Sequence, residues 1–230
     1  MIARFGLLKA RSGLSAERFS EHWLNSHGPL AAQFPGLQRY YQHLVTNKEQ
    51  FGIDHKRGMA DLDGFSELHF ESQDVMHRAI KSQSFAGALS DEEAFLDEVK
   101  IVVCEKHPVV PVKLGDGPYI KRMTLLKRLP GISAADFKRE WLVTHAQWVR
   151  QWPNVLGYTQ NLVVDRFHKS RTDSAEYDEV PVDGIVEFWF RNEAEAKDIY
   201  ASDIVTKTQQ HALIFLDEIT PFFVKTSQIV

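Results

Sequence analysis

The sequence contains a single cysteine, Cys104, in 230 residues, so an intrachain disulfide is excluded. Its neighbours, IVVCEKH, favour a buried thiol in a strand over a nucleophile. The chain also lacks an apolar run long enough to cross a membrane, and it lacks a signal peptide. We therefore expect a soluble, cytoplasmic protein with no membrane partner.

Patterns that bind nucleic acid, phosphate or metal are missing as well. The formal net charge is -4 and no basic stripe is present, which argues against a nucleic-acid partner. No glycine-rich phosphate loop occurs, and the serine-rich stretch 82–90, SQSFAGALS, lacks a nucleophile elbow and predicts a helical turn. Close-spaced ligand motifs such as His-Glu-x-x-His are absent. We expect no metal site and no cofactor.

What the sequence does contain is an internal duplication. A shift of 118 positions places GLSAERFSEHWLNSH (13–27) over GISAADFKREWLVTH (131–145). After a two-residue insertion, a shift of 120 places DGFSELHF (63–70) over DGIVEFWF (183–190) and FLDEV (95–99) over FLDEI (215–219). The chain is therefore two copies of one unit. We set the first repeat at 1–110, a linker at 111–118 within HPVVPVKLGDGP, and the second repeat at 119–230.

Each copy predicts the element order β-α-β-β-α-β. Strands are expected at 2–9, 37–45, 64–70 and 99–105 and at the matching positions of the second copy, where the last strand covers 219–229. Ser15 is a good N-cap for the first helix, which Gly28-Pro29 should interrupt, whereas the second copy's helix should continue to about Gln151. The polar stretches 46–62 and 165–182 predict long exposed loops.

The strands carry apolar residues on both faces. In residues 184–190, GIVEFWF, neither alternating set is polar, so both faces of the sheet should be buried. The helices can cover only one face, and the other face must pack against the second repeat. The predicted fold class is α+β, with two ferredoxin-like βαββαβ repeats packed sheet to sheet in one closed barrel. The chain would be a monomer with an internal pseudo-dimer, compatible with a further homodimer.

The residues resemble a known family at this point. The combination of LLK, GLSAERFSEHWLNSHGPL, DGFSELHF and DEEAFLDE resembles the EthD family of the dimeric α+β barrel superfamily, here as a tandem duplication. The second copy departs from the pattern, since Ala-Gln-Trp follows His145 and His211-Ala212 replaces Asp91-Glu92. The resemblance implies the barrel fold and a role in small-molecule catabolism or polyketide-type metabolism.

Three function classes follow from the resemblance. The first is a cofactor-independent lyase or isomerase acting on a small apolar carbonyl, lactone or aromatic compound in the barrel cavity. The second is a non-catalytic protein that binds an apolar ligand. The third, less favoured, is a haem- or metal-dependent oxidoreductase, for which His43 and His69 could join His27. Their counterparts Asn161 and Trp189 would restrict such a site to the first half.

Glu67 and Glu187 are the most informative polar residues. Each lies in the middle of an apolar strand, and strand alternation directs both, with His69 and Trp189, into the space between the sheets. Burial would raise the pKa of a glutamate toward the range useful for general acid–base catalysis. The alternative is a structural glutamate paired with a tyrosine or with the repeated arginines at 4 and 122.

The remaining candidates are histidines and a polar strand face. His27 and His145, each at a helix end, could be an acid–base group, a ligand or a satisfied core residue. Tyr40 and Gln42, repeated as Tyr158 and Gln160, could line a cavity or satisfy hydrogen bonds at a sheet interface. The full set comprises catalytic candidates Glu67, His27 and His69, and ligand-binding candidates Tyr40, Gln42, His43, Glu187, Trp189 and His145. We expect the better pocket in the first half, with Trp189 filling its own side.

Overall fold

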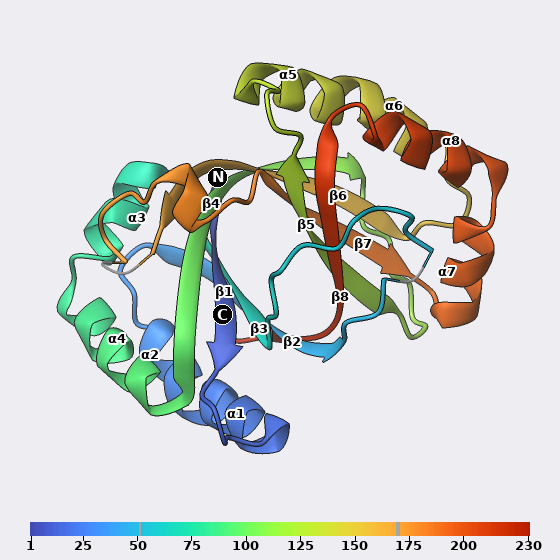
Figure 1. Cartoon of the computed structure of the whole chain (residues 1–230). Helices are drawn as coiled ribbons and strands as arrows, with labels where there is room; N and C mark the ends of the chain where they lie inside the picture. The colour runs from blue at the N-terminus through green and yellow to red at the C-terminus, as the bar shows by residue number, and fades with distance from the viewer. Residues whose placement is uncertain (51, 169–170) are drawn as a thin grey trace.

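A computed structural model describes residues 1–50, 52–168 and 171–230 (Figure 1). The first repeat contains, in order, β1 (Ile2–Ala10), α1 (Ala16–His22), the π-turn η1 (Trp23–His27), α2 (Gly28–Ala31), β2 (Leu37–Asn47), β3 (Gly64–Phe70), α3 (Gln73–Ala79), α4 (Gln83–Phe95) and β4 (Leu96–Val110). The second contains β5 (Ile120–Arg128), α5 (Ala134–Arg139), the π-turn η2 (Glu140–His145), α6 (Ala146–Val149), β6 (Gly157–Phe167), the 3₁₀ turn η3 (Tyr177–Glu179), β7 (Gly184–Phe190), α7 (Glu193–Tyr200), α8 (Asp203–Ala212) and β8 (Leu216–Gln228).

The eight strands close into one antiparallel barrel in the order β1-β3-β2-β8-β5-β7-β6-β4. The repeats are joined by two strand pairs, β2 with β8 and β4 with β6. Helices α1–α4 cover one side of the barrel and α5–α8 the other (Figure 1). The predicted fold, two βαββαβ units sharing one closed barrel, is confirmed.

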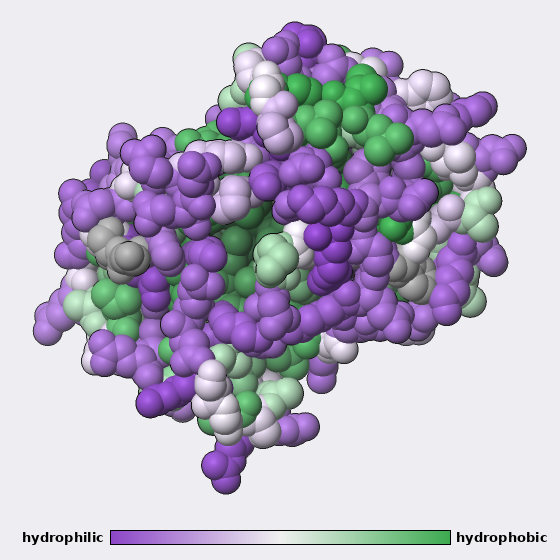
Figure 2. Space-filling view, viewed as in Figure 1, coloured by the Kyte–Doolittle hydropathy of each residue, from purple (hydrophilic) through white to green (hydrophobic). Residues whose placement is uncertain are grey.

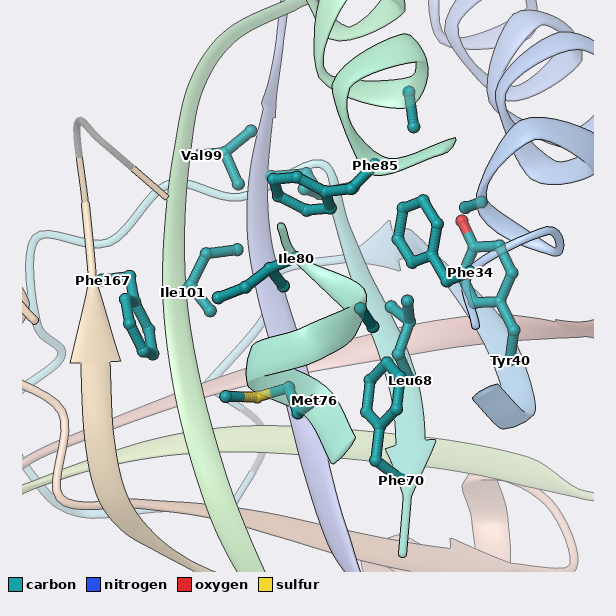
Figure 3. Packing of buried hydrophobic residues seen from close by; sticks show 14 of the residues in the cluster. Phe34, Tyr40, Leu68, Phe70, Met76, Ile80, Phe85, Val99, Ile101 and Phe167 are labelled. Carbon is teal, nitrogen blue, oxygen red and sulfur yellow. The ribbon is translucent and has the colours of Figure 1, made fainter. Parts of the chain in front are cut away.

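Strand alternation divides the apolar residues into an interior core and two outer cores. The interior core lies inside the barrel and includes Phe5, Phe65 and Phe222, none of them exposed to solvent. Each outer core lies between one repeat's helices and the outside of its strands. Figure 3 shows the first of these, where Phe85 and Ile80 from the helices meet strand residues. Both strand faces are therefore buried, as their composition predicts.

The strands at the junctions are longer than predicted. β4 continues to Val110 because its last residues pair with β6 of the other repeat, with His107 opposite Gln160. β4 and β8 also begin three residues early, since Leu96 pairs with Ala10 and Leu216 with Arg128. All of these pairs join residues far apart in the sequence, so the local sequence does not predict them.

The prediction that Gly28-Pro29 interrupts the first helix is wrong. Residues 23–27 form a π-turn, in which the Gly28 N–H bonds to the Trp23 carbonyl five residues earlier, and the helix then continues through α2. Proline clashes with the carbonyl four residues before it in a regular α-helix, and the wider turn relieves that contact. The second repeat has the same turn, and its helix ends at Val149, close to the expected position.

Among the described residues, no helix has the length and apolar character needed to cross a membrane.

Candidate functional site

The barrel interior is filled in the middle and hollow at both ends. Phe5, Phe65, Met123 and Phe222 form a fully buried plug across the centre. Cys104 belongs to the same buried cluster, and burial raises the pKa of its thiol well above the usual range, so it stays protonated. The prediction of a buried strand thiol is confirmed. The plug separates two cavities with different linings.

The end near the start of β1 holds a cavity of about 490 Å³, which we call the charged pocket. Seven strands, β2 to β8, contribute to its lining because alternate residues of each strand point inward. It is lined by Arg39, Tyr41, His43, Glu67, His69, Lys106, Val112, Leu114, Tyr119, Lys121, Thr159, Glu187, Trp189, Thr226 and Gln228. Five of the residues selected from the sequence, His43, Glu67, His69, Glu187 and Trp189, come together here.

Two glutamates and two lysines form a network at the floor of the charged pocket. Lys106 Nζ contacts Glu67 Oε1 and lies 2.9 Å from Glu187 Oε1. Lys121 Nζ lies 2.6 Å from Glu187 Oε2 and 3.9 Å from Glu67 Oε2. Asn161 Nδ2 donates a further bond of 2.9 Å to Glu187. Each carboxylate is thus bridged to the other by both ammonium groups.

The network reverses the expected ionisation of the glutamates. Burial raises the pKa of Glu67, but the Lys106 charge, hydrogen bonds from His43 and His69, and the Lys121 charge outweigh it and hold that pKa well below 4.5. Burial and the Glu67 charge raise the pKa of Glu187, and the two lysines lower it to about 2. Both side chains are therefore carboxylates at neutral pH. The expectation of a raised glutamate pKa is wrong because the charges of Lys106 and Lys121 outweigh the effect of burial.

Two histidines flank Glu67. His43 Nε2 donates to Glu67 Oε2 at 2.8 Å, and its Nδ1 lies 2.9 Å from the Thr226 hydroxyl. Burial and the Lys121 charge lower the pKa of His43 to about 4, so it is neutral. His69 Nε2 lies 2.7 Å from Glu67 Oε1, and a carboxylate can only accept this bond. His69 Nδ1 is buried and has no hydrogen-bond partner in the described chain.

Tyr40 and Gln42 lie outside the pocket, on the helix-covered face of β2. Gln42 Nε2 donates 2.7 Å to the Trp23 carbonyl at the π-turn and 3.0 Å to the Tyr40 hydroxyl. Gln160 makes the equivalent bonds in the second repeat. Figure 3 shows Tyr40 in the outer core beside Phe34. Tyr40 and Gln42 therefore do not line the charged pocket. They satisfy buried hydrogen bonds, as the alternative interpretation expects, but at the π-turn rather than at a sheet interface.

His27 and His145 also lie on the helix side. His27 Nδ1 is 3.0 Å from Asp91, which also contacts His22 at 3.0 Å. His145 Nδ1 is 3.3 Å from His211 Nδ1. Burial, together with the His211 and His55 charges, lowers the pKa of His145 to about 3. Neither histidine joins Glu67 or His69.

The two lysines of the charged pocket, Lys106 and Lys121, are not among the candidates chosen from the sequence. Neither lysine is repeated in the other half of the chain. The position equivalent to Lys106 in the second repeat is Thr226, and the position equivalent to Lys121 in the first repeat is Ala3. Residues that both repeats share therefore include neither lysine. The available signal was parity, because Lys106 alternates with the buried Cys104 along β4.

The charged pocket belongs to both repeats rather than to the first alone. Glu67 and Glu187 lie in the same cavity, so the expectation that the better pocket belongs to the first half is wrong. Trp189 lines the pocket instead of closing it, and Lys121 Nζ lies 4.8 Å from the centre of its ring. In the described residues, no three side chains among His, Cys, Asp and Glu gather as a metal-ligand set.

The opposite end of the barrel holds an apolar recess of about 460 Å³. Leu7, Leu62, Leu125 and Val182 line it, with charged side chains such as Lys127 at the rim. The segment between β2 and β3 crosses this opening in Figure 1, and Figure 2 shows hydrophobic atoms within a hydrophilic surround. The recess therefore combines apolar walls with six charged side chains, Lys9, Asp61, Glu98, Lys100, Lys127 and Glu218.

Comparison with known proteins agrees with the architecture. The family model described as "EthD domain" matches residues 11–98 and 129–219, which is most of both repeats. No curated protein sequence matches the chain.

Solved structures share the fold across the whole chain. An anthrone oxidase-like protein aligns with a TM-score of 0.67 at 8% identity, covering 99% of this chain and 93% of its own. A proposed monooxygenase from Lactobacillus acidophilus NCFM aligns with a TM-score of 0.56 at 10% identity, covering 99% and 94%. A mutant chlorite dismutase from Candidatus Nitrospira defluvii gives 0.52 at 12%, covering 97% and 91%. At these identities the likeness concerns the fold alone.

Proposed function

The chain belongs to the EthD family, and from that premise we propose that it is a cofactor-independent enzyme moving protons on a small molecule. The substrate class is a small carbonyl, lactone or aromatic compound bound in the charged pocket. The reaction is an isomerisation or an elimination. His69 is the base, Glu67 positions it, and the two lysines stabilise the negative charge that develops on oxygen.

One observation carries this proposal: an ionised carboxylate holds His69 at Nε2, while its buried Nδ1 has no hydrogen-bond partner in the described part of the chain. A carboxylate at one ring nitrogen holds the imidazole in the tautomer whose other nitrogen accepts a proton, and it stabilises the imidazolium that follows. Glu67 is suited to this task because it is ionised. The proposal therefore assigns it positioning rather than proton transfer.

The chemical step balances within the pocket. A C–H bond next to a carbonyl breaks, the proton goes to His69 Nδ1, and the electron pair moves to the carbonyl oxygen. Lys106, whose side chain is 21% exposed, is the ammonium group that a bound oxygen can reach. Return of the proton to another carbon gives an isomer, and loss of a leaving group gives an elimination product.

The pocket has a suitable size and lining for such a compound. Its volume of about 490 Å³ falls within the range that holds small ligands, roughly 300–1,000 Å³. Tyr41, Tyr119 and Trp189 provide aromatic walls, while Val112 and Leu114 add aliphatic contact. An apolar body and a single polarised oxygen fit this combination.

A non-catalytic binding protein is the second candidate. The observation favouring it is that both glutamates are fully engaged by lysines, as in a structural ion-pair network. In that case the pocket would bind the same compounds without changing them.

The two candidates differ in isotope exchange. Small ketones and lactones would be incubated with the protein in D₂O, and deuterium at the α-carbon would be followed by NMR. We expect exchange with the wild type and a loss of about a hundredfold or more in His69→Gln, the usual size of a general-base contribution. His27→Gln is the matched control, since His27 also pairs with a carboxylate but lies outside the pocket. Binding without exchange would select the second candidate.

A further inference from the structure

Arg4 and Arg122 occupy equivalent positions in the two repeats, and both are buried. They are 5% and 2% exposed, and each points to the helix-covered side of its sheet. Neither takes part in the charged pocket. A buried guanidinium is costly unless an anion compensates it, so the partners of the two arginines can be compared directly.

The first repeat supplies an anion beside Arg4. Glu92 on α4 raises the pKa of Arg4, offsetting part of the lowering by burial. Glu92 also accepts bonds of 3.2 and 3.3 Å from Arg171, whose carbonyl in turn lies 3.4 Å from Arg4 Nη2. The cavity remaining around these groups is only about 20 Å³. Arg4 Nε also has no hydrogen-bond partner in the described chain, but this guanidinium has a carboxylate nearby to compensate its charge.

The second repeat lacks that anion. Ala212 stands where the first repeat has Glu92, and burial alone lowers the pKa of Arg122 to about 9, with no carboxylate raising it. Nε and Nη1 of Arg122 have no hydrogen-bond partner in the described chain. Residues 51, 169 and 170, which lie outside that part, are Phe, Lys and Ser and carry no carboxylate. Aromatic rings surround the guanidinium instead, with Tyr200 at 4.5 Å and Phe188 at 5.5 Å.

A cavity of about 60 Å³ lies against this arginine. Two further polar atoms on residues that line it, the Thr124 hydroxyl and the Trp141 indole nitrogen, also lack a partner in the described chain. Trp152 and Val186 add apolar walls. The cavity thus combines hydrogen-bond donors and an uncompensated positive charge with an apolar surround.

We propose that this cavity between the sheet and the helices of the second repeat is a binding site for a small carboxylate. The carboxylate would accept hydrogen bonds from Arg122, with Thr124 and Trp141 as further donors. Its short aliphatic part would lie among the aromatic rings. The cavity volume restricts the ligand to about two or three carbons, the size of acetate or propionate.

This site is separate from the charged pocket. Lys121 and Arg122 are consecutive on β5 and point to opposite faces of the sheet, the first into the barrel and the second toward the helices. Occupancy of the carboxylate site can therefore be measured whether or not the barrel is catalytic.

The test is thermal unfolding of the full chain at pH 7 in rising acetate or propionate, at constant ionic strength set with chloride. Ligand binding to the folded state alone raises the midpoint in proportion to occupancy. We expect a saturable rise with either carboxylate and none with acetamide, the neutral analogue. Absence of a rise in the wild type would overturn the proposal. So would an equal rise when chloride itself is varied.

Two variants locate the effect. Arg122→Met keeps a long side chain without charge, and it should weaken the apparent affinity at least tenfold. Ala212→Glu introduces a carboxylate at the position of Glu92 in the first repeat. It should raise the unfolding midpoint in the absence of ligand and abolish the further rise with acetate or propionate. Arg4→Met is the matched control and should keep the wild-type affinity. If Ala212→Glu does not fold, Arg122→Met still decides, since an unchanged response there contradicts the assignment.

Discussion

At the residue scale, a side chain's partners determine its chemistry more than its burial does. Glu67 is buried and His145 is partly buried, yet one is a carboxylate and the other a neutral ring. The difference is that two ammonium groups face Glu67, whereas His145 faces another histidine. Burial alone predicts a neutral form for both, which is correct only where no opposite charge is near.

Stability should depend on pH through His145. Its pKa in the folded chain is about 3, below the value of about 6.5 in an unfolded chain. As pH falls below 6.5, the unfolded chain takes up a proton at this position that the folded chain does not. The free energy of unfolding should therefore decrease from pH 6.5 toward pH 3. In His145→Gln this decrease should be shallower, which urea unfolding at successive pH values would measure. An identical slope in the variant would exclude His145 as a source.

At the scale of single elements, the π-turns explain why the same glutamine recurs in both repeats. Each widened turn presents a tryptophan carbonyl toward the neighbouring strand, and Gln42 or Gln160 donates to it. The neighbouring contact differs between repeats. His22 and Asp91 of the first are replaced by Glu140 and His211 of the second, so acid and imidazole have exchanged places between helices.

Gln42→Leu should destabilise the fold. The substitution removes a buried donor to the Trp23 carbonyl and to the Tyr40 hydroxyl, at a cost of about 1–3 kcal/mol. Gln33→Leu is the control, because Gln33 is exposed and its bond to the Pro29 carbonyl can be replaced by water. Urea unfolding of both variants would compare the two free energies. Equal effects would show that the buried bond contributes little.

The sequence predicts which side chains of β3 and β7 face the barrel interior, but it does not predict this for β2. In GFSELHF and GIVEFWF, each glutamate shares its parity with His69 or Trp189, and the sequence analysis directed all four side chains correctly into the barrel. In LQRYYQHLV, both parities combine an aromatic with a polar residue. The sequence pattern therefore does not distinguish two orientations of this strand. Either Tyr40 and Gln42 or Tyr41 and His43 could face the barrel interior. Only the register with the neighbouring strands decides it.

At the scale of the whole molecule, duplication was enough to predict the fold but not the site. A repeat shows what both copies need, namely the barrel, the helix caps and the buried tryptophans. The cations of the charged pocket, and the missing counter-ion of Arg122, arise where the copies differ. Such differences have meaning only once the structure shows which residues face each other.

Neither repeat should be stable alone as a monomer. A fragment of residues 1–118 would expose the edges of β2 and β4, together with the inward-facing Phe5 and Phe65. We expect it to self-associate, and to form a one-to-one complex when mixed with residues 119–230. Size-exclusion chromatography with light scattering would measure both. A monomeric fragment that unfolds cooperatively would contradict the shared core.

The bridging lysines have a consequence for how such a pocket can be built. In a barrel of two identical chains, a two-fold axis copies every substitution, so one lysine between the glutamates always brings a second at the mirrored position. A single chain has no such axis. Lys121 can face Trp189 while Ala3 occupies the mirrored place, and Lys106 can reach both carboxylates while Thr226 supports His43. The two ends of a bound molecule can then contact different side chains, as an asymmetric substrate requires.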